Sequence, residues 1–214
     1  MASTAKPKDL ASAIGWTPPE NWPARSRAEC KAILTAPGMR FEMEEVDIRG
    51  VPTRVWKNAP PNLRAIAMLG ASHGDRTFTI YQDERVTYDA WFRAVATLAH
   101  EFQAMGIGKG DRVALAMRNL PEWPVVFFAT VTIGAICVPL NAWWTGPELA
   151  YGLSDSGTKL VVCDEERWER IAEHRGEIPE LEHVLVTRHE GELKGASRLE
   201  DILGSVTRNA VANH

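Results

Sequence analysis

The residues whose types could do chemistry are scattered along the chain, and none stands in the spacing of a known catalytic or metal-binding motif. No two histidines have the HExxH spacing that places two imidazoles on one face of a helix around zinc. No GxSxG turn is present that would expose a serine nucleophile. The six histidines are His73, His100, His174, His183, His189 and His214. The sequence therefore nominates no catalytic, cofactor-binding or metal-binding residue.

One glycine-rich segment, residues 106–110 (GIGKG), has the composition of a phosphate-binding loop. Such a loop follows a strand and opens a helix, so that amide groups at the helix N-terminus face the anion. Here the order is reversed, because a helical apolar pattern ends at Gly106 and a strand pattern begins after Gly110. We interpret this segment as the stop of a helix followed by a turn.

Two adjacent tryptophans, Trp143 and Trp144, stand between a predicted strand and the cap of the next predicted helix. Packing beneath that helix is the simpler interpretation. Lining of a path for a hydrophobic substrate is the alternative, because indole rings offer large apolar surfaces.

The three cysteines, Cys30, Cys137 and Cys163, are odd in number and form no CxxC pair, so no zinc site or thioredoxin-like motif is indicated. Cys137 and Cys163 lie inside apolar runs, which is typical of buried thiols in a reducing compartment. No apolar core of a signal peptide follows the first ten residues. We therefore expect a cytoplasmic protein.

The composition is that of a globular protein, with 45% hydrophobic and 24% charged residues in a chain of 214. The formal net charge of -4 argues against nucleic acid as a partner, because no basic excess is present to neutralise phosphates. Residues 123–140 carry no charge and are just long enough to span a membrane. Pro124, Gly134 and Pro139 interrupt this segment, which favours a buried helix followed by a buried strand over a membrane span.

The first part of the chain predicts short elements. Residues 1–40 are rich in proline and tryptophan, which favours short helices and extended pieces wrapped on a larger body. Residues 44–57 predict a hairpin that turns at 49–52. Asn62 is the expected cap of a helix that reaches Ala71. Residues 77–81 predict a strand that turns at 82–85 into a second short strand.

The clearest helix is predicted after Thr87, because apolar residues recur there with a helical period until Gly106. His100 falls on the polar side of this helix, where we expect it to be solvated. From Arg112 on, strands alternate with helices, which indicates an α/β fold with a mostly parallel sheet and flanking helices. The expected strands are 113–117, 135–140, 159–163 and 183–187. The expected helix starts are Asn119 with Glu122, Thr145 with Glu148, Asp164, and Ser197 with Glu200.

Several motifs along residues 62–187 together indicate a family, although no single residue in them indicates a reaction. The main ones are 86–91 (VTYDAW), 105–117 (MGIGKGDRVALAM), 119–123 (NLPEW) and 133–141 (IGAICVPLN). In this order and spacing they resemble the superfamily of acyl-CoA synthetases, adenylation domains and luciferases. Ala90 and Trp91 depart from the Glu-Leu that usually follows the Thr-Tyr of the first motif.

This resemblance implies a two-step reaction in the full-length protein, with ATP, Mg²⁺ and coenzyme A. A carboxylate attacks the α-phosphate of ATP to give an acyl-adenylate and pyrophosphate, and the thiol of coenzyme A then displaces AMP. The family performs these steps with a Thr/Ser/Gly-rich phosphate loop, a glutamate for magnesium, an aspartate for the ribose and a late lysine, and none of these motifs occurs before His214. We therefore expect this chain to be inactive alone and to bind none of these cofactors.

The resemblance also implies a domain organisation. Residues 1–60 are expected to form an N-terminal extension with short helices and a hairpin. Residues 61–214 are expected to form the first α/β subdomain of an AMP-binding domain, an incomplete portion of the family's large N-terminal domain that stops before the phosphate loop. Strands of the missing part would cover this sheet, so we expect exposed apolar surface and self-association.

Three functions stay open at this level. The main hypothesis is the N-terminal part of an AMP-forming carboxylate–CoA ligase, with long or medium fatty acids preferred among aliphatic, aromatic and bile-acid-like substrates and with a homodimer as one oligomeric state. The alternative is a non-catalytic binding or interaction module that kept the scaffold. The third is a nucleotide-binding domain of the dehydrogenase type, against which the missing strand–glycine loop–helix order counts.

Overall fold

The computed structural model describes residues 25–204, which fall into two compact units on either side of Ala59 and Pro60. In the first unit α2 (Arg27–Leu34) begins at a capping box formed by Ser26 and Glu29. An antiparallel hairpin of β1 (Met43–Ile48) and β2 (Val51–Trp56) follows and confirms the predicted hairpin. Its turn is shorter than predicted, because Arg49 and Gly50 both have positive φ and close it in two residues. The expectation of short helices before residue 25 lies outside the described residues.

The second unit opens with α3 (Leu63–Ala71), which Asn62 caps as predicted by accepting a hydrogen bond from Ala65 N. A second hairpin follows, formed by β3 (Thr77–Tyr81) and β4 (Glu84–Thr87). Thr87 then caps the long helix α4 (Tyr88–Ala104). The apolar stripe predicted for this helix is its buried face, with Trp91, Val95, Leu98, Ala99 and Phe102 in the core.

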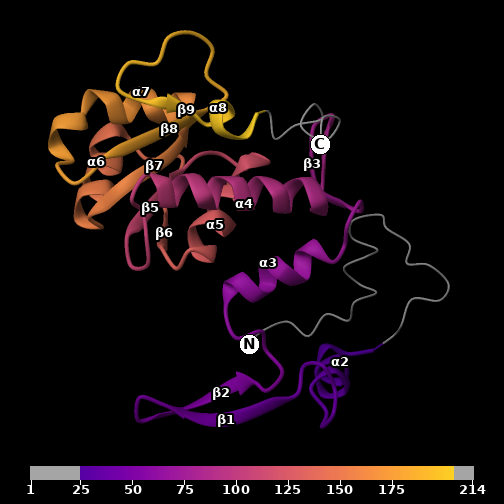
Figure 1. The fold of residues 1–214 in the computed structure, drawn as a ribbon. Helices are drawn as coiled ribbons and strands as arrows, with labels where there is room; N and C mark the ends of the chain where they lie inside the picture. Colours follow the sequence, from indigo (N-terminus) through magenta and orange to yellow (C-terminus); the bar gives the residue numbers. More distant parts are fainter. Residues whose placement is uncertain (1–24, 205–214) are drawn as a thin grey trace, which may run out of the picture. The chain divides into compact units, whose positions relative to one another are not determined.

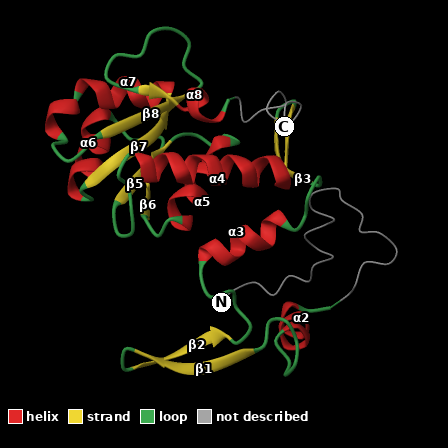
Figure 2. Cartoon of the chain, in the orientation of Figure 1, coloured by secondary structure: helices red, strands yellow, loops and turns green. Residues whose placement is uncertain are grey.

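A five-stranded parallel sheet in the order β6-β5-β7-β8-β9 forms the centre of the second unit (Figures 1 and 2). The strands are β5 (Arg112–Ala116), β6 (Ile136–Pro139), β7 (Thr158–Asp164), β8 (His183–Thr187) and β9 (Ser197–Arg198). The helices between them are α5 (Glu122–Thr132), α6 (Gly146–Asp155), α7 (Glu165–Glu173) and the short 3-10 helix η1 (Arg175–Glu177), and α8 (Leu199–Leu203) follows β9. The alternation predicted from Arg112 on is confirmed.

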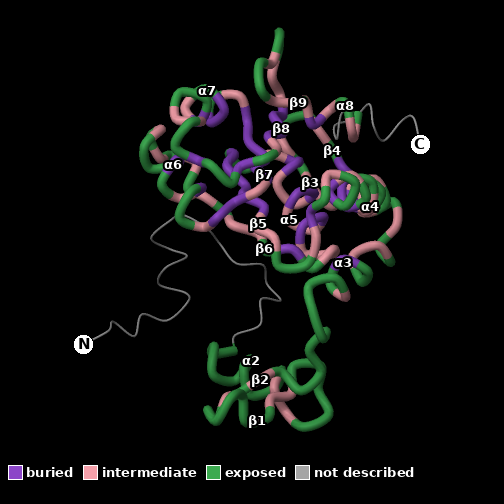
Figure 3. Tube along the Cα trace, turned by 60° about the vertical axis from the view of Figure 1, so that its left-hand side comes forward, coloured by how far each residue is buried: buried purple, intermediate pink, exposed green. Residues whose placement is uncertain are grey.

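Side chains of successive strand residues point to opposite faces of the sheet and form two separate cores. Val113 and Leu115 of β5 pack in the core that contains α4 and α5, whereas Ala114 and Ala116 pack in the core that contains α6 and α7. Figure 3 shows the buried residues concentrated along these strands and the facing sides of the helices. The sheet is therefore covered on both faces, which is what parallel strands with continuous apolar runs require.

The helix cap predicted at Asn119 is wrong. Helix α5 begins at Glu122 after Pro121 and has no side-chain cap. Pro121 has no N–H that Asn119 could accept from, and the Glu122 carboxylate accepts hydrogen bonds from Arg188 instead of reaching back. A contact distant in sequence therefore overrides the local capping pattern.

The cap predicted at Ser197 is also wrong. Ser197 lies in β9 beside Leu185 of β8, and the residue before α8 is Arg198. Glu200, the expected partner of Ser197, accepts hydrogen bonds from Thr187 Oγ1 and Arg188 N. Its carboxylate therefore ties α8 to the end of β8.

The uncharged segment at residues 123–140 forms most of α5 and all of β6. No residue of α5 is exposed, as its apolar composition predicts. Within the part of the chain that the structure describes, no helix has the length and apolar character needed to cross a membrane. β6 is the outer strand of the sheet, and the side chain of Ile136 on it is half exposed.

Candidate functional site

Parallel α/β sheets bind ligands outside the carboxyl ends of their strands, at the point where the strand order reverses. In this sheet the chain passes from β5 to β6 on one side and then returns to β7 on the other, so the reversal lies between β5 and β7. We call the residues at and just after the ends of β5, β6, β7 and β8 the C-terminal edge; they are residues 117–119, 140–145, 164–167 and 187–189. Two clusters of charged side chains are built there.

The first cluster is centred on Asp164, the last residue of β7 and the N-cap of α7. Its carboxylate accepts a hydrogen bond from Arg118 N at 3.0 Å and from Arg167 N at 3.2 Å. The buried guanidinium of Arg167 pairs with the same carboxylate at 3.2 Å and donates from Nε to Ala142 O at 2.7 Å. One ion pair thus ties together the ends of β5, β6 and β7, at the position where a ligand crevice is expected.

Arg118 and Trp143 form the exposed part of this edge. The Arg118 guanidinium carbon lies 3.9 Å from the centre of the Trp143 ring, which is a cation–π contact. The Trp143 side chain is 68% exposed, and its backbone N donates to Asn141 Oδ1. Among the described residues, the Arg118 side chain has no carboxylate partner. This pair therefore presents a positive charge and an aromatic face to solvent.

The second cluster surrounds Arg188, which follows β8 and has a positive φ of 57°. Its guanidinium donates to both oxygens of Glu122 at 2.9–3.2 Å and to both oxygens of Glu84 at 2.8 and 3.0 Å. The guanidinium also lies 5.3 Å from the centre of the Tyr81 ring. Arg188 therefore joins the β3–β4 hairpin, the start of α5 and the end of β8.

The electrostatics of the second cluster follow from burial. The Glu122 side chain is 3% exposed, and this desolvation raises its pKa above the ordinary value although the bonds from Arg188 oppose the shift. Burial disfavours the charge on Arg188, but its hydrogen bonds to Glu84 and Glu122 outweigh that effect and raise its pKa. The cluster thus holds a buried acid and a cation against one another.

The carboxylates of the two clusters are held in ion pairs with arginine. A magnesium ion needs several free oxygen ligands, but the carboxylates of Asp164, Glu122 and Glu84 are already bound by Arg167 and Arg188. Within residues 25–204 no group of three His, Cys, Asp or Glu side chains could hold a metal. The described residues therefore do not fit Mg²⁺.

The glycine-rich segment is a turn, as interpreted from the sequence. It connects α4 to β5, and Gly106 has a φ of 81° that favours glycine. The amide of Gly108 donates to Asp111 Oδ2 at 2.9 Å, so it is not free for a phosphate. The segment also precedes β5 and lies at the opposite end of this strand from the C-terminal edge.

The two tryptophans separate in the structure. Trp144 packs as predicted, because its ring lies against Gly152 of α6, where an added Cβ would come within 2.9 Å of it. Trp143 instead points to solvent beside Arg118, so packing is the wrong interpretation for this residue.

Sequence reasoning missed Arg167 and Arg188 as organising residues. Helical periodicity offered a signal for the first, because Arg167 lies four residues before the buried Ile171 and so falls on the buried face of α7. For Arg188 the chain offers no comparable local signal, since its partners lie 66 and 104 residues away in sequence.

Comparison with known proteins connects this fold to a family. A family model described as AMP-binding enzyme matches residues 67–209. Among curated proteins, the chain is 29% identical over 127 residues to 4-hydroxybutyrate–CoA ligase 2 of Metallosphaera sedula, covering 59% of the chain and 23% of that protein. It is 34% identical over 124 residues to crotonobetaine/carnitine–CoA ligase of Salmonella paratyphi A, covering 55% of the chain and 24% of that protein. The chain thus spans about a quarter of the length of these relatives.

Solved structures of longer proteins have a similar fold over part of their chains. The anthranilate CoA ligase AuaEII, crystallised with anthranoyl-AMP, superimposes with a TM-score of 0.64 at 26% identity, over 68% of this chain and 29% of that one. The N-terminal domain of FACL13 from Mycobacterium tuberculosis, crystallised with an inhibitor, superimposes with a TM-score of 0.59 at 27% identity, over 67% of this chain and 35% of that one. In both cases the similar region is a part of the longer neighbour.

Proposed function

The chain belongs to the AMP-binding enzyme family, and we propose that it supplies the N-terminal part of an acid–CoA ligase that forms AMP. The observation that carries the proposal is the family match over residues 67–209, which includes every strand of the parallel sheet. The two curated relatives and the AuaEII structure described above are named as acid–CoA ligases, which supports the same reaction class.

The proposed reaction of the complete enzyme converts a carboxylate into a thioester in two steps. The carboxylate oxygen attacks the α-phosphate of ATP, the bond to pyrophosphate breaks, and an acyl-adenylate forms. The sulfur of coenzyme A then attacks the acyl carbon, and AMP leaves with the electron pair of the broken bond. Adenylation is needed because a carboxylate is a poor electrophile, and the adenylate gives the acyl carbon a good leaving group.

We expect the 214-residue chain to be inactive alone. Support comes from the C-terminal edge, where each carboxylate of the two clusters is already paired with an arginine. Asp164 and Arg167 hold the ends of β5, β6 and β7 together. Arg118 and Trp143 are in contact at the same edge, and the Trp143 ring is exposed to solvent. In this proposal the phosphate-binding and proton-transfer groups come from other parts of the complete enzyme.

The test is acid-dependent release of pyrophosphate, measured for the 214-residue chain and for the native product of its gene. The intact mass of that product and the coding sequence after codon 214 come first. We expect a longer product that releases pyrophosphate only when the acid is present, and a 214-residue chain that releases none. Activity of the 214-residue chain itself would overturn the proposed inactivity, and a longer product silent with a broad panel of acids would overturn the ligase.

The finer points of the proposal concern substrate, organisation and place. Long or medium fatty acids are the proposed substrates, supported by 41% identity over 80 residues to the long-chain-fatty-acid–CoA ligase FadD13 of Mycobacterium tuberculosis. Residues 1–60 form the proposed N-terminal extension and residues 61–214 the proposed first α/β subdomain. We also propose a cytoplasmic enzyme and a homodimer, which fractionation and light scattering would check.

A non-catalytic interaction module is the second candidate. The observation that favours it is apolar exposure in the second unit: the side chains of Met68 and Leu69 on α3 are more than half exposed, and that of Ile136 on the outer strand β6 is half exposed. A native product that ends at His214, and a stable complex with a separate subunit, would select this candidate over the ligase.

A further inference from the structure

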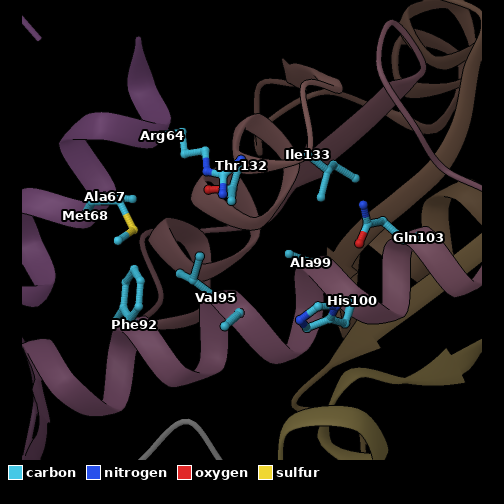
Figure 4. A pocket seen from close by; sticks show the side chains of 11 residues that line it. Arg64, Ala67, Met68, Phe92, Val95, Ala99, His100, Gln103, Thr132 and Ile133 are labelled. Atoms are coloured by element: carbon cyan, nitrogen blue, oxygen red, sulfur yellow. The ribbon is translucent and has the colours of Figure 1, made fainter. Parts of the chain in front are cut away.

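A pocket of about 360 Å³ lies between α3, α4 and α5 and has no part in the site described above (Figure 4). It is lined by residues 64–68 of α3, by residues 92–103 of α4, and by Thr132 and Ile133 at the end of α5, where α4 and α5 lead into β5 and β6. The pocket is therefore at the N-terminal end of the strands, away from the C-terminal edge. Its volume is at the lower end of the range for small-molecule sites, roughly 300–1,000 Å³.

The pocket combines an apolar wall with polar side chains that can donate hydrogen bonds. Met68 of α3 and Phe92 and Val95 of α4 form the apolar part. Arg64 of α3 and His100 and Gln103 of α4 supply hydrogen-bond donors, and no aspartate or glutamate lines the pocket. Such a lining favours an anion over a cation, because a carboxylate or phosphate would meet donors and no like charge.

The polar groups of this pocket lack partners within the described chain. The side chains of Arg64, His100 and Gln103 make no hydrogen bond or ion pair with a described residue. Thr132 Oγ1 is buried and also has none, whereas the neighbouring Thr130 donates to Val126 O at 2.8 Å. Buried hydroxyl groups without partners are uncommon. In Figure 4 Arg64 and Thr132 point toward one another from facing helices.

We propose that this pocket binds a small amphipathic carboxylate, with its carboxylate on Arg64 and its apolar body against Phe92 and Met68. The planar guanidinium of arginine matches a carboxylate with two parallel hydrogen bonds. Met68 of α3 and Phe92 of α4 both line the pocket and give the ligand body an apolar surface to cover. This proposal goes beyond the ligase function and does not depend on it, because the site is separate from the C-terminal edge and needs no nucleotide.

The test is calorimetric titration of the 214-residue chain with sodium octanoate, with 1-octanol and sodium acetate as matched probes. Octanol keeps the apolar body and lacks the charge, while acetate keeps the charge and lacks the body. Arg64→Gln removes the proposed partner of the carboxylate. Arg93→Gln makes the same change on α4 at an exposed arginine outside the pocket. Melting temperatures of both variants verify that the fold is kept.

We expect octanoate to bind more tightly than either matched probe, and Arg64→Gln to weaken its Kd by about ten-fold or more, as loss of a hydrogen bond to a charged group does. Arg93→Gln should leave the Kd unchanged, and methyl NMR should place the bound ligand beside Met68 and Val95. The proposal is overturned if octanoate does not bind, if octanol binds equally well, or if both arginine variants have the same effect.

Discussion

Replacement of Arg188 by methionine tests how the second unit is held together. The change removes the cation that faces Glu122 and Glu84, and it keeps a side chain of similar length with the same penalty at positive φ. Loss of one partner of a buried ion pair costs about 3–5 kcal/mol of unfolding free energy. We take the lower end, about 3 kcal/mol at pH 7, because the Arg188 and Glu84 side chains are 28% and 23% exposed.

The penalty should depend on pH in a defined direction. Burial already raises the pKa of Glu122 in the folded chain, and in the variant the opposing bonds from Arg188 are gone, so its pKa rises further. An acid whose folded pKa is raised binds its proton more tightly when folded, so its contribution to stability is present below its ordinary value of 4.5 and is lost as the pH rises through the folded pKa. As the pH rises above 4.5, the variant should therefore lose stability more steeply than the native chain.

The assay is urea unfolding followed by tryptophan fluorescence and circular dichroism at pH 5 and pH 7. Glu122→Gln in the Arg188→Met background removes the buried charge and should recover a large part of the loss at pH 7. Arg93→Met is the matched control, because the Arg93–Asp89 pair is exposed and 3.9 Å apart, and it should change stability by less than about 0.5 kcal/mol. The reasoning is refuted if Arg188→Met costs less than about 1 kcal/mol at pH 7, or if Glu122→Gln recovers nothing.

Two further changes probe packing and thiol burial. Gly146→Ala should destabilise the chain by about 1–3 kcal/mol, because the added Cβ would lie 2.6 Å from the His174 ring and 3.1 Å from Arg170 O. A thermal melt unchanged from that of the native chain would contradict this close packing. Labelling with a thiol reagent under native conditions should modify the exposed Cys30 first. Burial raises the pKa of Cys137 to about 11, and Cys163 is fully buried, so both should react only as the chain unfolds. Equal labelling rates of the three thiols by mass spectrometry would contradict this order.

The elements could be predicted from the sequence wherever a local pattern decides them. The apolar stripe of α4 and the capping pattern of Thr145 with Glu148 depend on residues a few positions apart, and the structure has both. The caps at Asn119 and Ser197 failed because carboxylates that could have completed them bind groups far away in sequence. A capping pattern predicts the partner that is nearest in sequence. In the folded chain, Arg188 and the end of β8 bind these carboxylates instead.

The charged clusters could not be predicted for a related reason. Asp164 is recognisable as a helix cap from its own neighbourhood, but its bond to Arg118 N crosses from β7 to β5 and depends on the order of the strands in the sheet. The same order brings Ala142 within reach of Arg167. A motif search reports residues close in sequence, and this edge is assembled from four strand ends, so its residues become a group only when the topology is known.

The pairing within the C-terminal edge limits what the edge can contribute to a ligase. An anionic nucleotide needs cations that are free to meet it, and the guanidinium groups of Arg167 and Arg188 are held by carboxylates of the same chain. Arg118 differs, because its side chain contacts the exposed face of Trp143 and has no carboxylate partner among the described residues. If this unit contacts an anionic substrate in the complete enzyme at this edge, Arg118 is the residue whose charge is available for it, while the two buried clusters keep the strand ends in place.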